Sequence, residues 1–188
     1  MNIGDGMDIM DSIRASLDNN TNLTKDVSDG IFELIVLFHN NFPNINLDNL
    51  NKRLSKLKIE KTSKFEKSHI SNYSFVKNIL YFNSDEISKK YDAKHIMMFE
   101  LLNIITATDK QVGFNTDNRF VALNAGFTEV IANYLVGNSG EKLIYPDEAI
   151  MANLIMTVVG FENMLYAYFN NDSKFLLNKL MESGVKLW

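Results

Sequence analysis

The sequence contains no cysteine and only three histidines, His39, His69 and His95. Without cysteine there are no disulfide bridges, thiolate zinc sites, iron–sulfur clusters or cysteine nucleophile. So few histidines nearly exclude a histidine-rich metal site. The remaining composition, 46% hydrophobic and 22% charged over 188 residues, is that of a globular protein of one domain.

Basic residues are not in excess either, since 19 Lys and Arg face 23 Asp and Glu and leave a net charge of −4. This balance argues against a nucleic-acid partner. No segment approaches the roughly 20 consecutive apolar residues of a membrane span, and the acidic first residues differ from a signal peptide. We therefore expect a cytoplasmic protein that does not cross a membrane.

The first residues of the chain carry a weak pattern. Met10, Ile13 and Leu17 are spaced as on one face of a helix, but glycines and asparagines around them dilute the pattern. We interpret residues 1–22 as a mobile N-terminal arm, with an amphipathic helix as the alternative.

Two helices and a hairpin are predicted in the rest of the first half. Apolar residues recur at helical spacing over residues 27–42 and 47–57. Residues 72–83 are rich in β-favouring side chains, and the pair Lys77-Asn78 suits the turn of a hairpin. Residues 52–67 are basic, and we interpret them as a solvated helix face and loop, with a site for an anionic partner as the alternative.

The second half is predicted to be almost entirely helical. Asp92 and Asn124 are suitable N-caps, Gly137 suits a helix end, and Pro146 suits a first turn. The predicted helices cover residues 93–107, 125–136, 146–159, 162–170 and 174–182. The sequence therefore predicts one α+β domain over residues 23–188, in which a short sheet precedes a mostly helical C-terminal half.

Two segments follow each other in the order of a metallopeptidase site: residues 99–103 (Phe-Glu-Leu-Leu-Asn) and residues 124–129 (Asn-Ala-Gly-Phe-Thr-Glu). In zincins, His-Glu-x-x-His on a helix binds zinc through two imidazoles on one face, and its Glu activates the zinc-bound water. In gluzincins a downstream helix supplies a third ligand, often in an Asn-Glu-Gly context. With further matches at residues 145–146, 158–162 and 168–172, residues 70–188 resemble a little-characterised family of small bacterial zincin-like proteins of this gluzincin type.

The resemblance places three unsuitable side chains at the ligand positions. Phe99 and Asn103 stand where the family has histidines, and Ala125 stands where it has the ligand Glu. Phe and Ala offer no lone pair, and a neutral Asn is a poor zinc ligand. Glu100, the general-base position, keeps its type but has no metal-bound water to activate. The resemblance thus implies a zincin-like pseudoenzyme without metal, cofactor or catalytic residue.

Other interpretations of these residues stay open. Ile96, Phe99 and Asn103 also suit a plain core face with one hydrogen-bonded Asn. In an intact relative, Glu129 or His95 would orient a ligand from behind; here we expect Glu129 to bond backbone or Asn103. A displaced metal site built from His95, Glu129 and Glu100 is a further alternative.

The function expected from this resemblance is binding of a protein or peptide in the former substrate cleft or on another surface. The strand near residues 79–82 is the expected docking edge, and the ring of Phe99 is expected to fill the vacated site. One alternative is an active metallohydrolase with atypical ligands. Another is a helical regulatory or phage interaction protein whose likeness to zincins is accidental, in which no strand edge would face the helix of Phe99.

Overall fold

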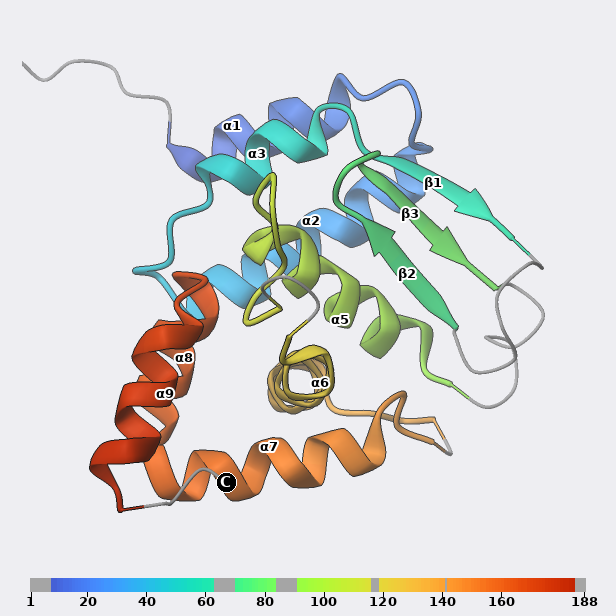
Figure 1. The fold of residues 1–188 in the computed structure, drawn as a ribbon. Helices are drawn as coiled ribbons and strands as arrows, with labels where there is room; N and C mark the ends of the chain where they lie inside the picture. Colours follow the sequence, from blue (N-terminus) through green and yellow to red (C-terminus); the bar gives the residue numbers. More distant parts are fainter. Residues whose placement is uncertain (1–7, 63–69, 84–90, 116–118, 141, 185–188) are drawn as a thin grey trace, which may run out of the picture.

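The computed structural model describes residues 8–62, 70–83, 91–115, 119–140 and 142–184 (Figure 1). Within these residues, eight helices accompany one three-stranded sheet. The predicted α+β class is therefore confirmed. No single described helix has the length and apolar character of a membrane span, although α7 (Pro146–Val159) and α8 (Phe161–Phe169) pass that test together as a pair bent by 113°.

The first described element is a helix, α1 (Ile9–Asp18), which Asp8 caps by accepting from the backbone N–H of Met10. Ile13 and Leu17 are fully buried because α1 packs on the next two helices. The mobile arm expected over residues 1–22 is therefore wrong from α1 onward, and the alternative, an amphipathic helix, is correct. Residues 1–7 lie outside the described residues.

The next two helices confirm the sequence pattern. Helix α2 (Lys25–Asn41) buries Ile31, Ile35 and Phe38, and the shorter α3 (Asp48–Leu54) buries Leu50 and Leu54. Both helices also contact α5 (Ala93–Thr106), so that the N-terminal helices cover the central part of the molecule.

The sheet contains the predicted hairpin and one strand that was not predicted. Strands β2 (Ser71–Ser74) and β3 (Ile79–Phe82) are antiparallel, and Asn78 adopts a positive φ of 54° in the turn between them. Strand β1 (Lys58–Lys61) pairs with β3 in parallel, which gives the order β1-β3-β2. The basic stretch over residues 52–67 therefore contains a strand as well as the predicted helix face and loop. β3 lies in the middle of the sheet, and β2 is an edge strand.

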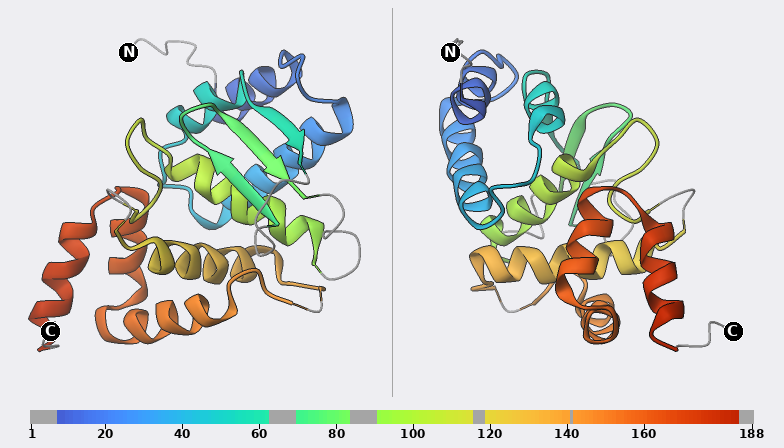
Figure 2. Two further views of the ribbon diagram at one scale, coloured as in Figure 1. Left: turned by 45° about the vertical axis from the view of Figure 1, so that its right-hand side comes forward. Right: turned by 90° about the vertical axis from the view of Figure 1, so that its left-hand side faces the viewer.

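Helix α5 (Ala93–Thr106) lies at the centre of the fold. Ten of its 14 residues are buried, because it packs against β2, α2, α3 and α6 (Val121–Val136). Asp92 caps it as predicted by accepting from the backbone N–H groups of Lys94 and His95. The left view of Figure 2 shows the sheet, α5, α6 and α7 stacked in that order.

The C-terminal helices are α6 (Val121–Val136), α7 (Pro146–Val159), α8 (Phe161–Phe169) and α9 (Ser173–Glu182). The predicted N-cap role of Asn124 is wrong, because α6 begins one turn earlier, after Phe120. The Asn124 side chain instead accepts from the backbone N–H of Phe114 at 2.9 Å. The helices α6 and α7 cross with little space between them: a Cβ on Gly126 would lie 1.9 Å from the carbonyl oxygen of Glu148.

Candidate functional site

A cleft of about 250 Å³ lies where α5, α6 and the edge strand β2 meet. Phe99, Glu100 and Asn103 line it from α5, and Ala125 lines it from α6. The other lining residues are Ser71, Asn72, Tyr73, Phe75, Val112, Asn115, Val121, Asn124 and Tyr145. Residues that the sequence places in two separate motifs are thus brought to one site.

The backbone explains this convergence. Phe99 and Asn103 are four residues apart on α5 and therefore share a face of that helix. Ala125 stands on α6 next to Gly126, and α6 packs directly against α5. The site is thus built from the two neighbouring helices at the centre of the fold.

Glu100 is the buried acidic group of the cleft, with a relative exposure of 1%. The side-chain amide of Asn103 donates to its Oε2 at 3.1 Å. The Ser71 hydroxyl and the backbone N–H of Tyr73 also donate to this carboxylate. Burial raises the pKa of Glu100, although these three donors act in the opposite direction. The carboxylate therefore ties α5 to β2.

Phe99 forms one wall of the cleft. Its side chain is 5% exposed, and its ring stacks on that of Tyr145 with the centroids 5.4 Å apart. Burial raises the pKa of the Tyr145 hydroxyl to about 12, and neighbouring carboxylates, including Glu100, add to this shift. The expectation of a filled site is wrong in part, because the ring is buried but the cleft remains open beside it.

His95 and Glu129 form a buried pair behind the cleft. The His95 Nε2 and the Glu129 Oε1 are 2.8 Å apart, and the His95 Nδ1 donates to the Gly137 carbonyl at 2.8 Å. Burial acts to lower the His95 pKa, but the hydrogen bonds to Glu129 and Gly137 outweigh it and raise this pKa. The Glu129 carboxylate also accepts from the backbone N–H of Ile144 at 3.2 Å.

This pair joins α5, α6 and the segment before α7. The expected bond from Glu129 to backbone is therefore confirmed, whereas a contact with Asn103 is not, because the Asn103 amide bonds Glu100. Across the described part of the chain, no three His, Cys, Asp or Glu side chains are grouped so that they could hold a metal ion. The alternative of a displaced metal site at His95, Glu129 and Glu100 is therefore wrong. His69 lies outside the described residues.

The edge strand of the cleft differs from the one expected. Residues 79–82 form β3, whose two edges are occupied by β1 and β2, so the docking edge predicted there is wrong. The strand that faces the cleft is β2, and its residues Ser71 and Tyr73 were missed as site residues. Tyr145 was missed too, although its position directly before Pro146 identifies it as the N-cap residue of α7.

Comparisons of the chain with protein-family models, with curated proteins and with solved structures give no match.

Proposed function

We propose that the protein is a catalytically inactive, zincin-like pseudoenzyme that binds an extended peptide segment in the cleft between β2, α5 and α6. The observation that carries this proposal is the convergence of Phe99, Asn103 and Ala125 around Glu100 in one cleft. These are the positions at which the resemblance places the zinc ligands and the general base.

The chemistry of these side chains supports a binding role. A ring, a neutral amide and a methyl group provide no set of zinc ligands. Glu100 is already occupied by donors from Asn103, Ser71 and Tyr73. Its carboxylate therefore has a structural role in holding the walls of the cleft together.

The edge strand supports a peptide as the partner. The Asn83 N–H donates to the Ile70 carbonyl, and in an antiparallel ladder only every second residue of β2 then exchanges backbone hydrogen bonds with β3. Ser71 and Tyr73 therefore turn their backbone N–H and C=O groups away from β3. Glu100 accepts the N–H of Tyr73 at this edge, so a peptide would pair with the other backbone groups that Ser71 and Tyr73 turn away from β3. An extended peptide adds to such an edge by backbone hydrogen bonds, and the cleft beside it accepts a side chain.

The two other functions are distinguished by specific features. A helical protein with an accidental likeness to zincins predicts no strand edge beside the helix of Phe99, and this expectation is wrong, because β2 packs on α5. An active metallohydrolase with atypical ligands predicts metal-dependent cleavage of peptides, which is tested directly below.

The test is selection of a random peptide library on the immobilised protein, followed by measurement of the affinity of the selected peptides. Ala125→Trp places a large ring in the cleft and should abolish binding. Ala122→Trp is the matched control, because Ala122 is exposed on the same helix and does not line the cleft.

Selected peptides should also shift the amide NMR signals of Ser71 and Tyr73, whose backbone groups turn away from β3. Peptides that bind both variants equally would overturn the proposed site. Cleavage of the peptides that depends on added zinc and is lost with a chelator would replace the pseudoenzyme by the metallohydrolase.

A further inference from the structure

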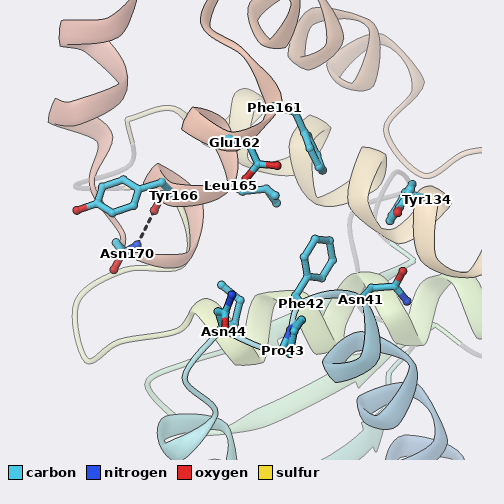
Figure 3. Close-up of a pocket in the computed structure, with 11 residues that line it drawn as sticks. Asn41, Phe42, Pro43, Asn44, Tyr134, Phe161, Glu162, Leu165, Tyr166 and Asn170 are labelled. Atoms are coloured by element: carbon cyan, nitrogen blue, oxygen red, sulfur yellow. Dashed lines mark hydrogen bonds between the residues drawn. The ribbon is translucent and has the colours of Figure 1, made fainter.

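A second and larger cleft, of about 520 Å³, lies between the end of α2, α6 and α8. It is separate from the site proposed above and shares no lining residue with it. Figure 3 shows Phe42 and Phe161 pointing into this space from opposite sides, with Tyr134 beside them. The lining residues are Asn41, Phe42, Pro43, Asn44, Ile45, Tyr134, Phe161, Glu162, Leu165, Tyr166 and Asn170.

Three aromatic rings form one wall of this space, with Tyr134 in contact with both phenylalanines. The ring centroid of Tyr134 is 6.4 Å from that of Phe42 and 6.5 Å from that of Phe161. Phe42 is held from behind by Phe38 at 5.3 Å, and Phe161 by Phe127 at 6.4 Å. Because the two phenylalanines are anchored on core rings, the aromatic wall is formed before any ligand binds.

The polar groups of this cleft favour a positive charge. Glu162 is exposed, points into the space in Figure 3, and has no ion-pair or hydrogen-bond partner among the residues that the structure describes. The side-chain amides of Asn41 and Asn170 donate to carbonyls of their own helices at 2.9 Å, which leaves their oxygens as acceptors. No Lys, Arg or His is among the lining residues. The negative end of the α2 dipole also lies here, and the positive end of α8 is offset by Glu162 in its first turn.

We propose that this cleft binds a small molecule through a quaternary ammonium group. Aromatic faces attract cations, and a neighbouring carboxylate adds charge attraction. A quaternary ammonium donates no hydrogen bond, so the aromatic wall of Phe42, Tyr134 and Phe161 can replace its water without leaving a donor unsatisfied. The volume of about 520 Å³ suits a small-molecule site. This proposal does not depend on the function proposed for the cleft at Glu100.

The test is titration of the ¹⁵N-labelled protein with choline and with 3,3-dimethylbutan-1-ol, which has the same shape and no charge. We expect choline to shift the amide signals of residues 41–42, 44–45 and 161–166 and to bind about tenfold more tightly than the neutral alcohol. Raising the salt concentration should weaken only the binding of choline.

Two variants locate the site. Glu162→Gln and Tyr134→Leu should each weaken choline binding about fivefold. The Tyr134 side chain is 64% exposed, so its replacement should leave the fold intact. Glu33→Gln is the matched control, because Glu33 is an exposed carboxylate of α2 outside this cleft and its loss should change nothing.

Equal affinity for the alcohol and choline, no binding of choline, or equal effects of Glu162→Gln and Glu33→Gln would overturn the proposal. A peptide with trimethyllysine that binds where choline does not would overturn the assignment to a small molecule.

Discussion

Replacement of Phe99 by alanine tests whether the ring is a structural part of the cleft wall. A buried Phe removes roughly 150–250 Å² from water, which at about 25 cal/mol per Å² corresponds to about 4–6 kcal/mol for complete transfer. Alanine keeps the Cβ, and the open cleft beside the ring lets water enter the vacated space. We therefore expect Phe99→Ala to lower the free energy of unfolding by about 3 kcal/mol, at the lower end of the range for buried Phe truncations.

Urea unfolding followed by circular dichroism gives this free energy. Val76→Ala is the control and should change it by less than about 0.5 kcal/mol, because Val76 is 80% exposed. A double-mutant cycle with Phe99→Leu and Tyr145→Leu should give a coupling of about 0.5–1.5 kcal/mol for the stacked rings. A cost of Phe99→Ala below about 1 kcal/mol would refute the reasoning and place the ring in solvent.

Three further predictions concern the surrounding fold. Gly126→Ala should lower the free energy of unfolding by about 3 kcal/mol or more in the same assay, because the new Cβ would collide with the backbone of Glu148. Gly30→Ala is the control and should raise it by about 0.5–1 kcal/mol, because a Cβ there meets no atom within 4 Å. The raised pKa of His95 predicts that the free energy of unfolding falls as the pH rises above 6.5, the ordinary pKa of histidine. If the free energy of unfolding of His95→Gln fell with pH in the same way, this prediction would be contradicted. The Ser139 hydroxyl and backbone donors lower the pKa of Asp92 from 3.8 to about 2, so Asp92→Ala should cost about 1 kcal/mol at pH 7 and progressively less as the pH falls from 3.8 to about 2.

Much of the helical part of this fold could be predicted, because its signals are local. Asp92, Pro146 and Gly137 mark helix ends through their own backbone and side-chain chemistry, and the structure places each one at the predicted end. Asn124 has the same N-cap chemistry, but Phe114 lies close enough to use its side-chain oxygen. A contact between distant residues therefore overrides the local preference at that position.

The strands and the edge of the cleft were harder to predict, because they depend on pairing between segments that are separated in the sequence. β1 (Lys58–Lys61) has three charged residues of four and becomes a strand only by parallel pairing with β3. The resemblance to zincins places the docking edge near residues 79–82, and without β1 the hairpin alone does not show that this strand is central. The convergence of Phe99, Asn103 and Ala125 was expected from helical spacing and the family resemblance. The Ser71 hydroxyl and the Tyr73 N–H, which donate to Glu100, lie on β2. The spacing of residues within α5 gives no sign of these two donors.

The most direct test of the account is zinc binding by the triple variant Phe99→His, Asn103→His, Ala125→Glu, measured by isothermal titration beside the unaltered protein. The account predicts binding of one zinc per chain by the variant and none by the unaltered protein, because the three new side chains would converge beside Glu100. The control carries both histidines with Ala122→Glu, whose carboxylate is outside the cleft, and should bind zinc more weakly. A folded triple variant with no more zinc affinity than the unaltered protein would contradict the claim that these positions are a lost ligand set.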